Sequence, residues 1–194
     1  MFLRLMLTKA AKTVASKRSI HKLGIFIGRF QPFHLGHLKD VKKALLKVDF
    51  LIILIGSAQE ERTERNPLSA VERKRIIKTA LTAATIPQTT YAICQVNDVG
   101  NHNLWVENII KTANMTKRIG KAALIFVGTE SSGHFTARLL AKKGYKIIKL
   151  KLLRGISGTK IRKLIRENKR WQHLVPKSIA KEIKKNIKLK LHKF

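Results

Sequence analysis

The sequence has few cysteines and few acidic residues, and it contains no long apolar run. Its single cysteine, Cys94, excludes an intramolecular disulfide and a cysteine-based zinc cluster, and we expect it to be a small core residue of a strand. No apolar stretch approaches the ~20 residues that a membrane-spanning helix requires. No internal repeat or low-complexity linker divides the 194 residues, a length that suits one domain with its own hydrophobic core.

The shortage of acids gives the chain an unusual charge. The chain contains 11 aspartates and glutamates but 41 lysines and arginines, which gives a formal net charge of +30. Such an excess attracts polyanions, namely nucleotides, nucleic acid or an anionic membrane surface. Drift of the composition toward lysine, with most side chains simply solvated, is an equal alternative. Nucleic acid therefore stays open as a partner without being predicted, and we expect no membrane partner.

Residues 1–22 contain no Asp or Glu and are rich in basic and apolar residues, which together allow a basic amphipathic helix. This composition is typical of a mitochondrial presequence. The alternative is an N-terminal extension of a uniformly basic protein. We expect a cytoplasmic protein, or a mitochondrial one if this segment acts as a presequence.

The rest of the chain alternates strand and helix patterns, including a helix that begins at about Leu104. This alternation predicts a single α/β domain over residues 23–176, with a parallel sheet covered by helices on both faces. Residues 177–194 form a basic helix with an apolar stripe. The five predicted strands, expected in the sheet order 3-2-1-4-5, are residues 23–27, 50–56, 91–96, 123–127 and 145–150.

The first strand leads into a loop whose residues suit phosphate. Residues 23–38 read LGIFIGRFQPFHLGHL, which predicts a strand, a tight loop and a helix with His34 and His37 in its first turn. The unpaired N–H groups and the positive dipole end of a helix N-terminus favour an anion. Arg29 adds donors to the same place, and Gly36 allows a ligand to approach the backbone closely. The segment therefore predicts phosphate binding by a nucleotide.

The run GRFQPFHLGH, residues 28–37, resembles the phosphate-binding signature of the nucleotidyltransferase superfamily, whose defining element is His-x-Gly-His. In its ten-residue form it is similar to the archaeal-type nicotinamide-mononucleotide (NMN) adenylyltransferases. The strand-loop-helix context disfavours a surface loop with two incidental histidines. A second run, ISGTKIR at residues 156–162, resembles the Ser-x-Thr-x-x-Arg element of the same superfamily. By itself the second run would be an ordinary helix cap followed by a solvated arginine.

The resemblance implies an ATP site built from both runs and from the end of the fourth strand. His34, His37 and Arg162 are the implied catalytic residues, in contact with the transferring and leaving phosphates. Thr129 stands where the family commonly has Asn, which weakens the prediction for the adenosine pocket. The implied ATP-binding residues are Gly28, Arg29, Phe30, Gln31, His34, Gly36, His37, Gly128, Ser157, Gly158, Thr159 and Arg162.

A nicotinamide site is implied by the loops after the second and third strands. Arg65 matches an arginine that binds the NMN phosphate, and Asp98 with the backbone of Val99 would recognise the carboxamide. Trp105 would stack on the cationic ring. His102 stands where the family has Asn, so its polar contact to NMN is altered. The alternatives are a solvated Arg65 and a Trp105 that serves only the core.

These observations predict a Rossmann-like adenylyltransferase that joins NMN and ATP into NAD and pyrophosphate. By the resemblance, Mg²⁺ enters with ATP, the protein supplies no metal site of its own, and the chain forms a homo-oligomer. Two alternatives remain. One is a nucleotidyltransferase of the same fold with another acceptor, such as a pantetheine phosphate or choline phosphate. The other is a basic protein that keeps the fold and binds RNA or a larger assembly.

Overall fold

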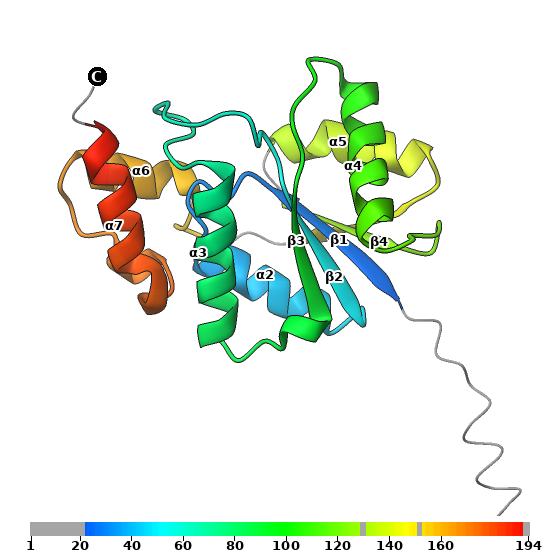
Figure 1. The fold of residues 1–194 in the computed structure, drawn as a ribbon, viewed down its shortest axis with the longest axis horizontal. Helices are drawn as coiled ribbons and strands as arrows, with labels where there is room; N and C mark the ends of the chain where they lie inside the picture. Colours follow the sequence, from blue (N-terminus) through cyan, green and yellow to red (C-terminus); the bar gives the residue numbers. More distant parts are fainter. Residues whose placement is uncertain (1–21, 129–130, 151–152, 192–194) are drawn as a thin grey trace, which may run out of the picture.

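The computed structural model describes residues 22–128, 131–150 and 153–191. Its centre is a five-stranded parallel sheet in the order β3-β2-β1-β4-β5, which confirms the predicted fold class and strand order (Figure 1). The predicted basic helix and presequence of residues 1–22 lie outside the described residues, except for Lys22. The strands are β1 (Leu23–Gly28), β2 (Phe50–Ile55), β3 (Tyr91–Gln95), β4 (Leu124–Gly128) and β5 (Lys146–Leu150).

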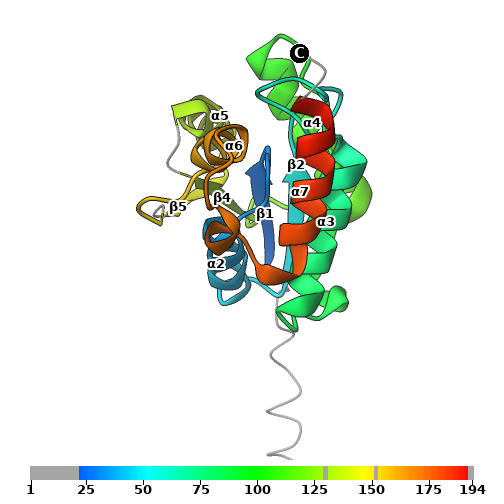
Figure 2. The same ribbon diagram turned by 90° about the vertical axis from the view of Figure 1, so that its left-hand side faces the viewer.

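Helices cover both faces of the sheet, as predicted. Figure 2 looks at the sheet through the layer formed by α2, α3, α6 and α7, while α4 and α5 pack against the opposite face. None of the described helices has the length and hydropathy that a membrane span needs. The helices are α2 (Leu35–Leu45), α3 (Ala70–Ala83), α4 (His102–Thr116), α5 (Ser131–Lys142), α6 (Gly158–Arg166) and α7 (Lys177–Leu191), with short 3-10 turns at Gln88–Thr90 and Gln172–Leu174.

The central strands are apolar at successive positions because both of their faces are buried. In β1, Phe26 packs into the layer of α2 and α3, whereas Ile25 packs into the layer of α4 and α5. In β2, Ile53 and Ile52 divide in the same way. The continuous apolar runs that indicated buried parallel strands are thus explained by two separate hydrophobic clusters.

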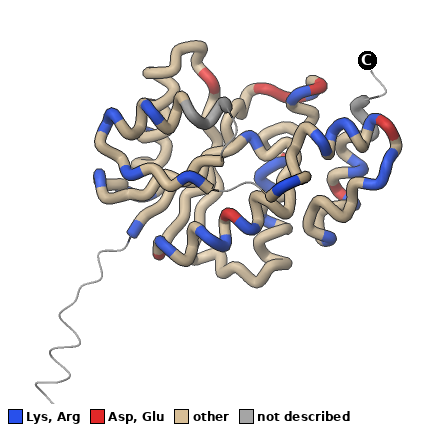
Figure 3. Tube along the Cα trace, turned by 180° about the vertical axis from the view of Figure 1, so that it is seen from behind, with Lys and Arg blue, Asp and Glu red and all other residues tan. Residues whose placement is uncertain are grey.

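The apolar stripe of α7 is fully buried. Ile179, Ile183 and Ile187 have no exposed surface and belong to the same cluster as the inner residues of α3 and α6. Lys177, Lys181, Lys184 and Lys185 of α7 are exposed, so the helix adds to the core while it carries charge to the surface. Lysines and arginines are spread along the chain rather than gathered in one segment (Figure 3).

Two local predictions are corrected by the structure. The helix expected from about Leu104 begins at His102, because the Asn101 side chain accepts hydrogen bonds from the N–H groups of Asn103 and Leu104 and caps it earlier. Cys94 is half-buried rather than a core residue, because β3 is an edge strand; its Sγ lies 3.0 Å from the Thr116 hydroxyl.

The fully buried guanidinium of Arg73 joins α3 to the ends of two strands. It donates hydrogen bonds to the backbone carbonyls of Arg29 (3.0 Å), Gly56 (2.8 Å), Ser57 (3.0 Å) and Ser69 (3.3 Å). Arg29, Gly56 and Ser57 follow β1 and β2, beyond the last paired residues of the two strands. Burial lowers the pKa of Arg73 to about 10, so the side chain stays charged at neutral pH.

Replacing Arg73 with Met should lower the free energy of unfolding by about 3 kcal/mol or more, because the carbonyls of Arg29 and Gly56 lose their donor and those of Ser57 and Ser69 keep only a backbone N–H. Urea unfolding followed by circular dichroism measures this. The matched control is Arg75→Met on the same helix: Arg75 is exposed and pairs with Glu182, so its loss should cost less than about 1 kcal/mol. Equal costs for the two variants would contradict a special role for Arg73.

Candidate active site

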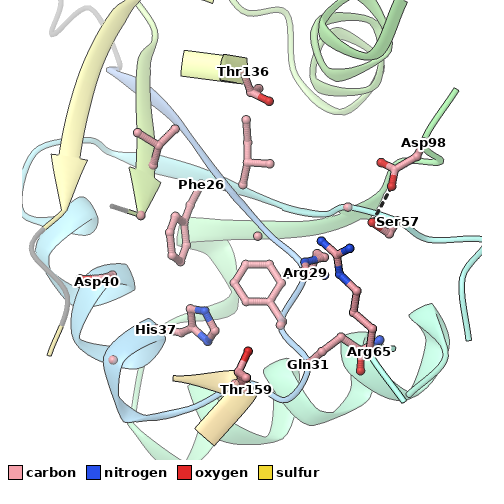
Figure 4. A pocket seen from close by; sticks show the side chains of 18 of the residues that line it. Phe26, Arg29, Gln31, His37, Asp40, Ser57, Arg65, Asp98, Thr136 and Thr159 are labelled. Atoms are coloured by element: carbon pink, nitrogen blue, oxygen red, sulfur yellow. Dashed lines mark hydrogen bonds between the residues drawn. The ribbon is translucent and has the colours of Figure 1, made fainter. Parts of the chain in front are cut away.

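A cavity of about 440 Å³ opens at the carboxyl edge of the sheet, where the loops after β1, β2 and β3 meet the end of β4 and the start of α6. This is the edge at which parallel α/β sheets bind ligands, near the point where the strand order reverses. All the candidate residues named from the sequence line this cavity except Ser157. Figure 4 shows their side chains converging from separate elements.

His34 and His37 cap the start of α2 by bonding to each other's backbone. The His34 N–H donates to Nδ1 of His37, and the His37 N–H donates to Nδ1 of His34, each at 3.3 Å. The two rings are stacked, with their centroids 3.6 Å apart. Because each Nδ1 accepts a hydrogen bond, the proton of each neutral ring is on Nε2. The pair therefore offers two Nε2–H donors.

Both histidines are neutral at physiological pH. Burial lowers the pKa of His34 to about 4. The pKa of His37 falls well below its ordinary value through burial and, secondarily, through the neighbouring His34. The histidines thus act as hydrogen-bond donors without positive charge, and the cationic groups on the cavity wall are Arg29, Arg65 and Arg162.

The second motif contacts the first directly. Arg162 donates through Nη1 to the carbonyl of Gln31 at 2.8 Å and through Nη2 to the Thr159 hydroxyl at 3.3 Å. Gly158 packs so closely on the same carbonyl that an added Cβ would lie 2.7 Å from it, so only glycine fits there. Ser157 does not line the cavity, and its hydroxyl caps α6 by accepting from the N–H of Lys160.

Three other residues of the first motif shape the loop from within. The Gln31 side chain exchanges two hydrogen bonds with the backbone of Leu68, at 2.7 Å and 3.1 Å. Phe30 is buried with a positive φ of 53°, and a Cβ on Gly28 would lie 2.8 Å from its ring. These three residues border the cavity, and their contacts hold the backbone that presents Arg29 and the histidines.

The other end of the cavity is built on β2, β3 and α4. The Ser57 hydroxyl donates to the Asp98 carboxylate at 2.6 Å. Gln59 fixes the same residue through its backbone: its amide donates to the Asp98 carbonyl at 3.1 Å and accepts from the Asp98 N–H at 2.9 Å. The Trp105 ring passes over Gly56, where an added Cβ would lie 3.3 Å from it. This end thus presents an indole ring beside an oriented carboxylate.

The rim at this end carries the remaining residues of the predicted nicotinamide site. Val99, His102 and Arg65 are exposed, and the His102 ring lies 4.4 Å from the ring of Phe135 on α5. Thr129, which stands at the substituted adenosine position, lies outside the described residues.

The sequence analysis missed some residues that line the cavity. Ser57 belongs to the run Gly-Ser-Ala-Gln at residues 56–59, where small residues directly after a strand were the available signal. Thr136 and Asp40 also line the cavity, and both lie inside helices, where no motif marks them. In the part of the chain that the structure describes, no three side chains from His, Cys, Asp and Glu gather as a metal site.

Known proteins of similar sequence and similar fold support one family assignment. Residues 25–164 match the family model described as cytidylyltransferase-like. A nicotinamide-nucleotide adenylyltransferase of Thermococcus sibiricus is 35% identical over 166 residues, which cover 83% of this chain and 82% of that protein. This chain belongs to the nicotinamide-nucleotide adenylyltransferase family.

Solved structures agree in fold. A bifunctional NMN adenylyltransferase/ADP ribose pyrophosphatase from Francisella tularensis superposes with a TM-score of 0.74 and 25% identity, over 86% of this chain. A structure described as that bifunctional protein with AMP and a manganese ion gives a TM-score of 0.73, 25% identity and 86% coverage of this chain. The chain spans about half of each of those chains, 49% in both cases.

The lowered pKa of His34 predicts a specific pH dependence of stability. The unfolded chain takes up a proton near pH 6.5 and the folded chain only near pH 4, so acidification through this window favours unfolding. Full stability is present above pH 6.5, and the loss should reach about 2 kcal/mol at pH 5. We expect His34→Asn, which keeps a capping side chain, to lose less stability than the wild type between pH 7.5 and pH 5 in urea unfolding. Parallel stability curves would contradict the assignment.

Proposed function

We propose that this chain transfers the adenylyl group of ATP to NMN, giving NAD and pyrophosphate. The family membership supports the reaction class, and the geometry of the cavity supports the two substrates. The observation that carries the proposal is a cluster of phosphate donors from two distant motifs, flanked on one side by an aromatic ring and an oriented carboxylate. This arrangement suits one phosphate-rich substrate at the centre and one nicotinamide nucleotide beside it.

In the proposed reaction, a phosphate oxygen of NMN attacks the α-phosphorus of ATP in line. The bond between that phosphorus and the α,β-bridging oxygen breaks, and pyrophosphate leaves with the electron pair. Such transfers depend on positioning and on stabilisation of developing charge rather than on a protein nucleophile. The Nε2–H groups of His34 and His37 would donate to the transferring phosphate. Arg162 and Arg29 would hold the β- and γ-phosphates with their forked donors.

The adenylyltransferase reaction uses a divalent cation, which we propose is Mg²⁺ bound to ATP. The structural relative that contains AMP holds a manganese ion. Because no metal-binding cluster occurs among the described side chains, the ion would be held by triphosphate oxygens and water.

The NMN end is proposed from the orientation of Asp98 and Trp105. One carboxylate oxygen of Asp98 accepts from Ser57, which fixes the group as an acceptor for the carboxamide N–H₂. The half-buried indole offers a face to the cationic pyridinium ring. Arg65 on the rim would pair with the NMN phosphate. Homo-oligomer formation remains a prediction and nucleic-acid binding an open alternative, and the spread of basic residues favours no particular polyanion surface.

The first test is NAD formation by the purified chain with Mg-ATP and NMN, measured together with pyrophosphate release. NAD should appear only when both substrates are present. In the same assay His37→Ala should lower kcat by at least ~2 orders of magnitude, the size typical for loss of a transition-state donor. The control is His173→Ala, an exposed histidine outside the cavity, which should retain wild-type turnover. Wild-type turnover in His37→Ala would exclude the proposed role.

A second variant tests the nicotinamide end separately. Trp105→Ala should raise KM for NMN about 10-fold or more while KM for ATP changes less than about 2-fold, because stacking contributes on the order of 1–2 kcal/mol. Trp105→Phe, which keeps an aromatic face, should recover part of the loss. A rise confined to KM for ATP would place the nicotinamide elsewhere.

A further inference from the structure

Asp40 is a buried acid in the wall of the cavity for which the reaction described above has no use. It lies on α2 with only 5% of its surface exposed, beside Val41 and Ala44, which are fully buried. It lines the same cavity as His37, which precedes it by one turn of the helix. Among the described residues, no side chain or backbone group donates a hydrogen bond to its carboxylate, and its oxygens are not among the polar atoms that are sealed from solvent without a partner, so the carboxylate faces the cavity.

Keeping a carboxylate in this position destabilises the free protein. Burial raises the pKa of Asp40 to about 6, and Lys43 and Lys39 on the same helix offset only part of this effect. Buried polar groups in proteins are normally satisfied by a partner. An unsatisfied acid that faces a ligand cavity is therefore a candidate for a contact made only when the ligand is bound.

The position of Asp40 indicates which part of the ligand it faces. Figure 4 shows His37 between Asp40 on one side and the Ser57–Asp98 pair on the other. With the phosphates at the central donors and nicotinamide beside Asp98, the nucleoside of ATP extends toward Asp40. Gly128 lines the cavity at the end of β4, and an added Cβ there would meet nothing within 4 Å.

We propose that the Asp40 carboxylate accepts a hydrogen bond from the nucleoside part of ATP, through a ribose hydroxyl or the exocyclic amino group of the base. This inference rests on the proposed function, because that function places ATP in this half of the cavity. An ionised carboxylate can only accept hydrogen bonds, and such charge-assisted bonds are strong. Asp40 is thus a specificity-determining residue that selects nucleotides by a donor group.

The proposal is tested by calorimetric titration of Mg-ATP into the full-length chain in the absence of NMN. Asp40→Ala should weaken ATP binding by about 10- to 100-fold, the range for one hydrogen bond to a charged group. Asp40→Asn, which keeps one acceptor oxygen of the same shape, should recover part of the affinity. The melting temperature of Asp40→Asn without ligand should rise, because a buried charge is removed. Lys42→Ala, exposed on the same helix, is the matched control and should change neither quantity.

ATP analogues identify the donor group. The titration is repeated with 2′-deoxy-ATP, 3′-deoxy-ATP and the triphosphate of purine riboside, which lacks the exocyclic amino group. The analogue that lacks the partner of Asp40 should bind the wild type more weakly than ATP does, by the factor seen for Asp40→Ala. That analogue and ATP should then bind Asp40→Ala equally, because the missing contact can be lost only once.

Wild-type ATP affinity in Asp40→Ala, or a further loss with every analogue in that variant, would overturn the proposal. A lowered melting temperature of Asp40→Asn would show that the carboxylate serves the fold instead. Because these titrations omit NMN, they remain informative if the wild type binds ATP but forms no NAD; that result would reject the proposed function alone.

Discussion

The active site depends on one buried cation, the guanidinium of Arg73. Parallel strands end with carbonyl groups that have no ladder partner, and here the loops after β1 and β2 turn inward to form a cavity. Arg73 satisfies the carbonyls of Arg29, Gly56 and Ser57 from a single side chain on α3. The guanidinium of Arg73 therefore holds both the loop that presents the histidines and the loop that orients Asp98. A shift in one loop would disturb the other.

Because the histidines are buried and the arginines that line the cavity are not, neutral donors and positive charges come from different side chains of the cavity wall. The stacked histidines lose their charge because they are desolvated, and their mutual backbone bonds leave each Nε2–H as a directed donor. Arginines supply the positive charge, and Arg162 is anchored by the carbonyl of Gln31 and by Thr159. In the proposed reaction, neutral donors at the transferring phosphate and cations at the leaving group would allow charge to shift toward pyrophosphate. The net charge of +30 contributes a general attraction for anions, while these few fixed groups provide the geometry.

Much of this arrangement was predictable because it is encoded locally. Continuous apolar runs identified the five strands, the first motif located the start of α2, and the helix cap in the second motif located α6. The two motifs predicted one side of the cavity wall, the side that carries His34, His37 and Arg162, because a helix N-terminus with Gly, Ser or His has a defined local structure. The exceptions are also local in origin: Ser157 is used as a helix cap, and Asn101 starts α4 earlier than its apolar pattern suggests. Cys94 is less buried than its neighbours imply because its strand lies at an edge.

The sequence by itself determined the alternation of strands and helices and the positions of the two motifs, because hydrophobic patterns and loop chemistry act over a few residues. Only the tertiary structure decided which side chains meet. In the folded chain, Arg162 bonds to the carbonyl of Gln31, which lies 131 positions away in the sequence. Arg73 is buried beneath two loops, and Asp40, one acid on a basic helix, is buried in the cavity wall. Burial and long-range contact depend on how all the elements pack, and no short stretch of sequence contains that information.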